Sequence, residues 1–310
     1  MGGWLTEPAH TGPSARLVVV MHGVRRNARE YVESWRAWSQ QAGRPVLAPL
    51  FDARHWPGAR AYNLGRVLDP EGWPVPYRER GFTALRRLVV EAQVAAGLTD
   101  PTWDLFGHSA GAQFAHRFAL LGEDATGARA LGAGAPEAPV EDLGKGIPVL
   151  GRVVVAGAGW FTVPDPGIDW PYGTRHPELG VDELTLTRWT RRPITFLRGE
   201  HDRDRDEHLR VDPGADAQGH TRWERAAHML AAGGRWDADC RWELVDVLGV
   251  GHHEHEMAPI VQARWSLSGD STRSCQKGGG SPAAEVGDAD VTSAGSAFAP
   301  GGVPTKPVMW

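Results

Sequence analysis

Short apolar runs alternate with amphipathic segments along most of the chain. The runs cover residues 16–22, 45–51, 102–107, 152–157, 193–199 and 242–248. Unbroken apolar runs of this length are typical of strands whose two faces are both covered by helices. Between the runs, apolar residues recur at helical spacing, as Tyr31, Trp35 and Trp38 do. Strands alternating with helices predict an α/β fold with a mostly parallel central sheet and helices on both faces.

Three segments interrupt this alternation. Residues 52–77 and 160–189 are rich in Pro, Gly and Trp, and we expect both to be long loops that shape a binding site. Residues 122–148 are rich in Gly, Ala and Pro and also predict a loop. From Ser268 onward the chain is Gly/Ser/Ala/Pro-rich without periodicity. We therefore predict one catalytic domain over residues 1–267 and a disordered tail over 268–310.

Charge and hydropathy narrow the class of protein. The 310 residues carry a net charge of −5 with both signs interspersed, which does not favour binding to nucleic acid or to an anionic membrane surface. No apolar run has membrane-spanning length, and residues 1–16 lack the pattern of a signal peptide. Two cysteines cannot form a disulfide framework. We expect a cytoplasmic protein.

The segment Gly107-His-Ser109-Ala-Gly111 carries the first sign of chemistry. It follows an apolar strand, precedes a helix-forming stretch and has the pattern G-x-S-x-G. This pattern is typical of a nucleophile elbow, a strained turn that presents a serine hydroxyl. A serine becomes a good nucleophile only when a base takes its proton and a third group orients that base.

The base and the acid are expected after later strands, because reacting groups gather at the carboxyl ends of parallel strands. Asp202 follows the strand ending at Gly199, and His252 follows the strand ending at Leu248. The order Ser109, Asp202, His252 is that of the α/β-hydrolases. The alternatives are His253 for the base and Glu200, Asp204, Asp206 or Asp165 for the acid.

An acyl-transfer site also needs two NH groups that bind the developing oxyanion. Ala110 NH is the first candidate, because it follows the nucleophile. Val24 NH is the second, in the glycine-bearing loop after the first predicted strand, with Arg25 as the alternative donor. We expect His22, His108 and Trp160 to contact the substrate.

Two runs contain residues that can bind metal ions. The run His252-His-Glu-His255-Glu256 fits neither helical zinc template, because no histidine stands at the required spacing. The run that starts at Asp202 resembles a calcium loop, but Glu207 replaces the required glycine and Pro213 the final glutamate. We expect no metal and no organic cofactor.

The His22-Gly23 loop, the Ser109 elbow, the Gly199-Glu-His-Asp202 turn and the Gly251-His252 loop together resemble the α/β-hydrolase superfamily over residues 15–267. Within it, the chain is similar to bacterial serine esterases of the polyhydroxybutyrate-depolymerase and feruloyl-esterase-like branch, without a large cap domain. The resemblance implies hydrolysis of a small carboxylic ester through an acyl-enzyme. Acyl transfer, amide or peptide hydrolysis, and a catalytically silent ligand-binding protein are the alternatives.

Overall fold

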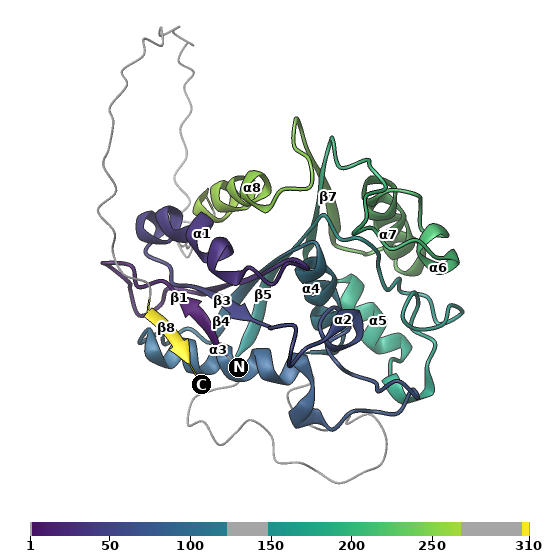
Figure 1. The fold of residues 1–310 in the computed structure, drawn as a ribbon, viewed down its shortest axis with the longest axis horizontal. Helices are drawn as coiled ribbons and strands as arrows, with labels where there is room; N and C mark the ends of the chain where they lie inside the picture. Colours follow the sequence, from purple (N-terminus) through teal and green to yellow (C-terminus); the bar gives the residue numbers. More distant parts are fainter. Residues whose placement is uncertain (1, 123–147, 268–305, 310) are drawn as a thin grey trace, which may run out of the picture.

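A computed structural model describes residues 2–122, 148–267 and 306–309, which form one sheet with helices on both faces (Figure 1). The sheet has eight strands in the order β7-β6-β5-β4-β2-β3-β1-β8. Strands β2 to β7 run parallel, whereas β1 is antiparallel to both β3 and β8. The strands are β1 (Gly2–Leu5), β2 (Leu17–Met21), β3 (Val46–Leu50), β4 (Thr102–His108), β5 (Val149–Ala156), β6 (Ile194–Gly199), β7 (Trp242–Val247) and β8 (Lys306–Met309).

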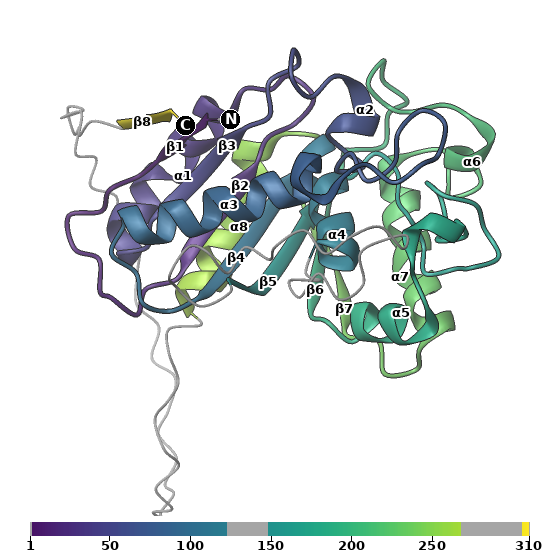
Figure 2. The same ribbon diagram turned by 90° about the horizontal axis from the view of Figure 1, so that it is seen from below.

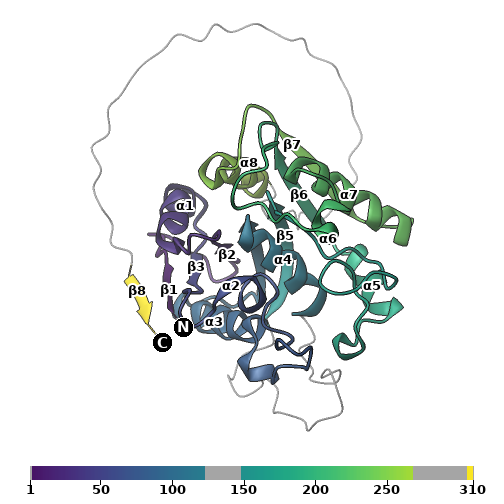
Figure 3. The same cartoon turned by 45° about the vertical axis from the view of Figure 1, so that its right-hand side comes forward.

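Two helical layers cover the sheet (Figure 2 and Figure 3). Helices α1 (Ala28–Ala42) and α8 (Glu254–Leu267) pack together on one face, where they share one apolar cluster. The other face carries α3 (Gly81–Ala95), α4 (Ala110–Leu121), α5 (Glu183–Thr190) and α7 (Arg222–Trp236). The short helices α2 (Gly58–Ala61) and α6 (Pro213–Asp216) and the 3-10 turns Tyr77–Glu79 and Pro177–Leu179 lie in loops.

Strand β2 shows why the apolar runs become central strands. All five of its residues are buried. Val18 and Val20 belong to the cluster under α1 and α8, whereas the remaining three residues belong to the cluster on the opposite face. Because side chains alternate along a strand, only an unbroken apolar run can fill both layers.

Strand register brings the loops of interest to one edge. Met21 of β2 lies opposite Gly107 of β4, and His108 lies opposite Ala156 of β5. Gly199 of β6 lies opposite Val247 of β7. The residues after these strands therefore meet at the carboxyl edge of the sheet.

The predicted α/β architecture is confirmed, with three differences. Strand β1 was not predicted, because it is short and begins with two glycines; a Cβ on Gly3 would lie 2.8 Å from the carbonyl oxygen of Ala48. Helix α5 lies in a segment expected to lack regular structure. Strand β8 lies in the predicted disordered tail. Residues 268–305 and 310 of that tail, and residues 123–147 of the loop predicted over 122–148, lie outside the described residues.

Candidate active site

Ser109 occupies a strained turn between β4 and α4. Its φ of 56° and ψ of −116° lie in a region that non-glycine residues rarely adopt. Its amide donates a hydrogen bond to the carbonyl oxygen of Ala156 at 2.9 Å, which ties the turn to β5. This geometry is typical of a nucleophile elbow.

The flanking glycines make this turn possible. A Cβ on Gly107 would lie 2.3 Å from the carbonyl oxygen of Gly111. A Cβ on Gly111 would lie 2.2 Å from the carbonyl oxygen of Met21, at the end of β2. Both contacts are with backbone, which cannot move aside cheaply, so each position requires glycine.

The loop after β2 lies against the serine. A Cβ on Gly23 would lie 3.6 Å from the Cβ of Ser109. Within the described part of the chain, the NH groups of Val24 and Ala110 donate no hydrogen bond. The same holds for Arg25 NH, so the geometry leaves the choice between Val24 and Arg25 open.

Arg26, which the sequence analysis did not single out, braces this loop. It has a positive φ of 60°, and its guanidinium donates to the carbonyl oxygens of Phe51 at 2.6 Å and Trp56 at 2.9 Å. It also lies over the Tyr62 ring, 4.1 Å from its centroid. The loop is thereby fixed to the segment after β3.

His252 and Asp202 form a hydrogen-bonded pair after β7 and β6. Nδ1 of His252 lies 2.7 Å from Oδ2 of Asp202, and the carboxylate is buried. Gly157, after β5, makes room for this pair, because a Cβ there would lie 3.0 Å from Nδ1 of His252. The alternative base His253 is exposed, and its ring instead lies near that of His255.

A buried arginine holds the acid. Arg222, the first residue of α7, is 2% exposed. One of its nitrogens lies 3.2 Å from Oδ1 of Asp202 and 2.6 Å from Oδ2 of Asp206. The hydrogen bonds from Arg222 lower the pKa of Asp206 to about 2. Asp206 therefore serves as a partner of Arg222 in this structure, while Asp202 contacts the histidine.

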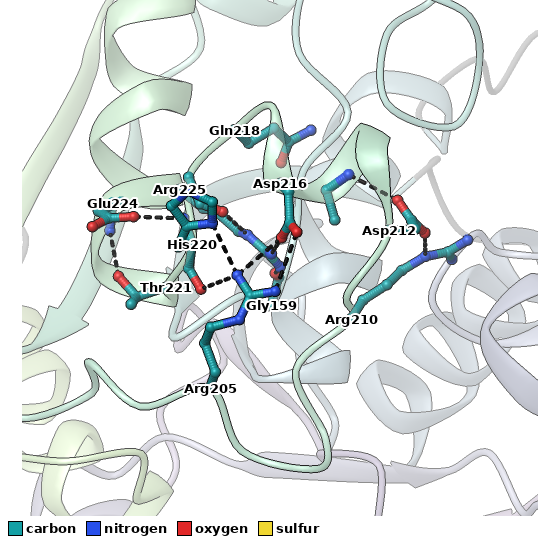
Figure 4. Close-up of polar contacts among 12 residues, drawn as sticks. Gly159, Arg205, Arg210, Asp212, Asp216, Gln218, His220, Thr221, Glu224 and Arg225 are labelled. Atoms are coloured by element: carbon teal, nitrogen blue, oxygen red, sulfur yellow. Dashed lines mark hydrogen bonds and ion pairs between the residues drawn. The ribbon is translucent and has the colours of Figure 1, made fainter.

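A second arginine network holds the loop after β5 against α6 and α7 (Figure 4). The buried Arg225 donates to the carbonyl oxygen of Gly159 at 2.5 Å and to Asp216 at 2.9 Å. Arg205 reaches the other oxygen of Asp216 at 3.1 Å and also contacts His220. Because Gly159 stands two residues after Gly157, this network supports the backbone beneath His252.

The three residues expected to contact substrate are buried: His22, His108 and Trp160 are 0%, 4% and 2% exposed. His22 accepts a hydrogen bond from the amide of Phe51 at Nε2, and Nδ1 donates to the carbonyl oxygen of Gly23. Burial lowers the pKa of His22 to about 4, so its ring is neutral. It braces the loop backbone.

Two arginine side chains lie against the Trp160 ring. The guanidinium of Arg117 lies 4.1 Å from the Trp160 ring centroid, and that of Arg210 lies 4.9 Å away. Trp170, by contrast, lines a cavity of about 390 Å³ between residues 59–72 and 170–176. The loops expected to shape a binding site thus form a cavity, with Trp170 in its wall.

Two features of the described residues bear on other classes of function. None of the helices there is long and apolar enough to span a membrane. No group of three or more His, Cys, Asp or Glu side chains in the same part of the chain is arranged to bind a metal ion.

The chain is similar to several solved structures, among them a hydrolase and a depolymerase. Poly(aspartic acid) hydrolase-1 from Sphingomonas sp. KT-1 is 29% identical, with a TM-score of 0.72 over 84% of this chain and 90% of that one. The poly(3-hydroxybutyrate) depolymerase LpqC from Bordetella parapertussis is 30% identical, with a TM-score of 0.70 over 84% of this chain and 83% of that one. No protein-family model and no curated protein matches the chain.

Proposed function

Because this chain belongs to the α/β-hydrolase superfamily, as a hydrolase similar to poly(3-hydroxybutyrate) depolymerase, we propose that it cleaves carboxylic esters with a Ser109–His252–Asp202 triad. The observation that carries the proposal is the 2.7 Å contact between His252 Nδ1 and Asp202, at the sheet edge where Ser109 occupies its strained turn. Asp202 accepts a hydrogen bond from the Nδ1–H of His252, which leaves Nε2 of His252 free to act as the base.

In the first half-reaction, the Ser109 hydroxyl oxygen attacks the ester carbonyl carbon while Nε2 of His252 takes the hydroxyl proton. The carbonyl oxygen becomes negative and accepts hydrogen bonds from the NH groups of Ala110 and Val24. The tetrahedral intermediate collapses when the bond to the alcohol oxygen breaks. His252 gives its proton to the departing alcohol, and the acyl group remains on Ser109.

In the second half-reaction, His252 removes a proton from water, and the resulting hydroxide attacks the acyl-enzyme carbonyl. The bond to Ser109 breaks, His252 returns the proton to the serine oxygen, and the carboxylic acid leaves. These steps require no metal or organic cofactor.

Amide hydrolysis is the second candidate. One similar structure is named a hydrolase of poly(aspartic acid), a polymer whose residues are joined by amide bonds, and the same triad chemistry attacks esters and amides alike. Parallel assays with p-nitrophenyl esters, oligomeric 3-hydroxybutyrate and poly(aspartic acid) separate the two. Added alcohols or amines as competing acceptors would reveal acyl transfer among the products.

The decisive test is Ser109→Ala. We expect a fluorophosphonate to label the wild type covalently and not to label this variant, and the kcat for p-nitrophenyl acetate to fall at least about a thousandfold. Ser14→Ala, at an exposed turn, is the matched control and should be labelled like the wild type. Equal labelling of wild type and Ser109→Ala, or no labelling of either, would refute the proposal.

A further inference from the structure

The hydroxyl of Tyr31 contacts both the loop after β2 and the residue before the nucleophile. Tyr31 lies on α1 and is buried. The amide of Gly23, in the loop after β2, donates to this hydroxyl at 3.0 Å. The same hydroxyl lies 2.9 Å from Nδ1 of His108, the residue before the nucleophile.

These contacts settle the direction of both hydrogen bonds. An amide can only donate, so the Tyr31 oxygen accepts from Gly23. Among the described residues, Nδ1 of His108 is the one remaining group that contacts the hydroxyl. The hydroxyl therefore donates its proton to Nδ1, and neutral His108 carries its own proton on Nε2.

His108 in turn contacts the general base. Its ring centroid lies 4.7 Å from that of His252, with 35° between the ring planes. Burial and the neighbouring His252 hold the pKa of His108 well below its ordinary value, so the ring stays neutral. Nε2 of His108 is buried without a hydrogen-bond partner in the described residues, so the ring is oriented through Nδ1, by Tyr31.

We propose that Tyr31 is a positioning residue that couples the oxyanion loop to the general base through His108. Its hydroxyl fixes the amide of Gly23, directly before the Val24 NH that would bind the oxyanion, and also fixes the ring on which His252 packs. The inference rests on the proposed function and adds a residue to it.

Gly23 supports this assignment. A Cβ there would lie 3.1 Å from the Tyr31 hydroxyl, so only glycine leaves the phenol undisturbed at hydrogen-bonding distance from the loop. A catalytic group that is slightly displaced from its position beside the reacting atoms loses much of its effect on the rate. The Tyr31 hydroxyl positions both the loop that carries the Val24 NH and, through His108, the ring of His252. Its loss should therefore affect kcat more than KM.

The first test is Tyr31→Phe, measured with p-nitrophenyl acetate. We expect kcat to fall about 10- to 100-fold while KM changes little, since a misplaced oxyanion donor weakens binding of the transition state. Titration of active sites with a fluorophosphonate gives kcat per active site, which loss of folded protein alone would not change. Tyr172→Phe is the matched control, because it removes a hydroxyl that binds Asp212 at 2.6 Å, and its kcat should stay within about twofold of wild type.

The second test asks whether Tyr31 acts through His108. Asparagine at 108 keeps an acceptor oxygen near the place of Nδ1, whereas leucine removes it. We expect His108→Asn, which keeps an acceptor for the Tyr31 hydroxyl but not the ring beside His252, to lose less kcat per active site than His108→Leu, and His108→Leu to lose as much as Tyr31→Phe. The double variant Tyr31→Phe/His108→Leu should then lose no more than either single variant.

The outcomes separate this inference from the proposed function. Unlabelled wild type refutes both. If the wild type is labelled but Tyr31→Phe has an unchanged kcat, only the coupling is overturned. The same holds if the loss of kcat in Tyr31→Phe/His108→Leu equals the product of the two single losses.

Discussion

The two sides of the candidate active site are held by different means. Around Ser109, backbone atoms of β2, β4 and α4 approach so closely that only glycine fits at 107 and 111. Around Asp202, buried guanidiniums supply the support, with Arg222 on the carboxylate and Arg225 on the loop behind it. Backbone contacts tolerate no added atom, whereas ion pairs can be weakened in steps. We therefore expect a substitution at the glycines around Ser109 to abolish activity, whereas a substitution in the ion pairs around Asp202 should only lower it.

The largest effect is expected for Gly111→Ala. Its Cβ would lie 2.2 Å from the carbonyl oxygen of Met21, so β2 and α4 would have to separate. We expect urea unfolding to show a loss of about 4 kcal/mol or more in stability, and the remaining folded protein to have almost no esterase activity.

Gly234→Ala is the matched control for this change. It lies within α7, where an added Cβ meets no atom within 4 Å. Alanine there should be neutral or stabilising by about 0.5 to 1 kcal/mol. Near wild-type activity of Gly111→Ala would contradict the view that backbone contact sets the serine turn.

A smaller effect is expected for Arg222→Met on the acid side. Removal of the guanidinium leaves the buried Asp202 without its cationic partner, which should cost about 3 kcal/mol of stability. The carboxylate still faces His252 but is less firmly oriented, so kcat should fall about 10- to 100-fold without being abolished.

Arg205→Met tests whether burial makes the difference. Its partner Asp216 and its own side chain are partly exposed, so the loss should be below about 1 kcal/mol with little change in kcat. Equal effects of the two substitutions would show that Arg222 has no special part in orienting the acid.

The same contrast explains what the sequence could predict. Glycine spacing and strand ends pointed to Ser109, Asp202 and His252, because these signals are local in the chain. Arg222 and Tyr31 were missed as parts of the site, since a buried polar partner is defined by tertiary contacts that no local pattern records.

The burial and orientation of side chains are a second feature that local sequence patterns do not predict. His22 and His108 were expected to contact the substrate because of their positions near strand ends, but sequence does not reveal that both rings are buried and hydrogen-bonded within the protein. Trp160 and Trp170 both lie in the loop over residues 160–189, but sequence does not reveal that Trp160 is buried against arginines while Trp170 lines the cavity. In the fold, the central strands can be predicted from their unbroken apolar runs. Strand β1 has no such run, and it forms by pairing with β3.

An effect smaller than that of Arg222→Met is expected at Glu254, which follows His252 by two residues and anchors the start of α8. Its carboxyl group accepts hydrogen bonds from Ser34 and from Trp35, each at 3.0 Å, and burial raises its pKa from 4.5 to about 7. The folded protein therefore keeps a proton that the unfolded chain has already released. The free energy of unfolding should fall as the pH rises from about 4.5 to about 7, and this contribution should stay constant above that.

Glu254→Gln should remove this pH dependence, because the amide stays neutral and still accepts from Trp35. The change of pKa corresponds to about 3 kcal/mol, which residual solvent contact reduces to about 2 kcal/mol. Between pH 5 and pH 8, the free energy of unfolding of Glu254→Gln should therefore rise by about 2 kcal/mol relative to that of the wild type. Urea unfolding at both pH values measures it, with Glu256→Gln, exposed in the same helical turn, as control. If both variants follow the wild-type pH dependence, Glu254 is ionised in the folded state. A charged rather than a neutral carboxyl group then anchors the start of α8, next to His252.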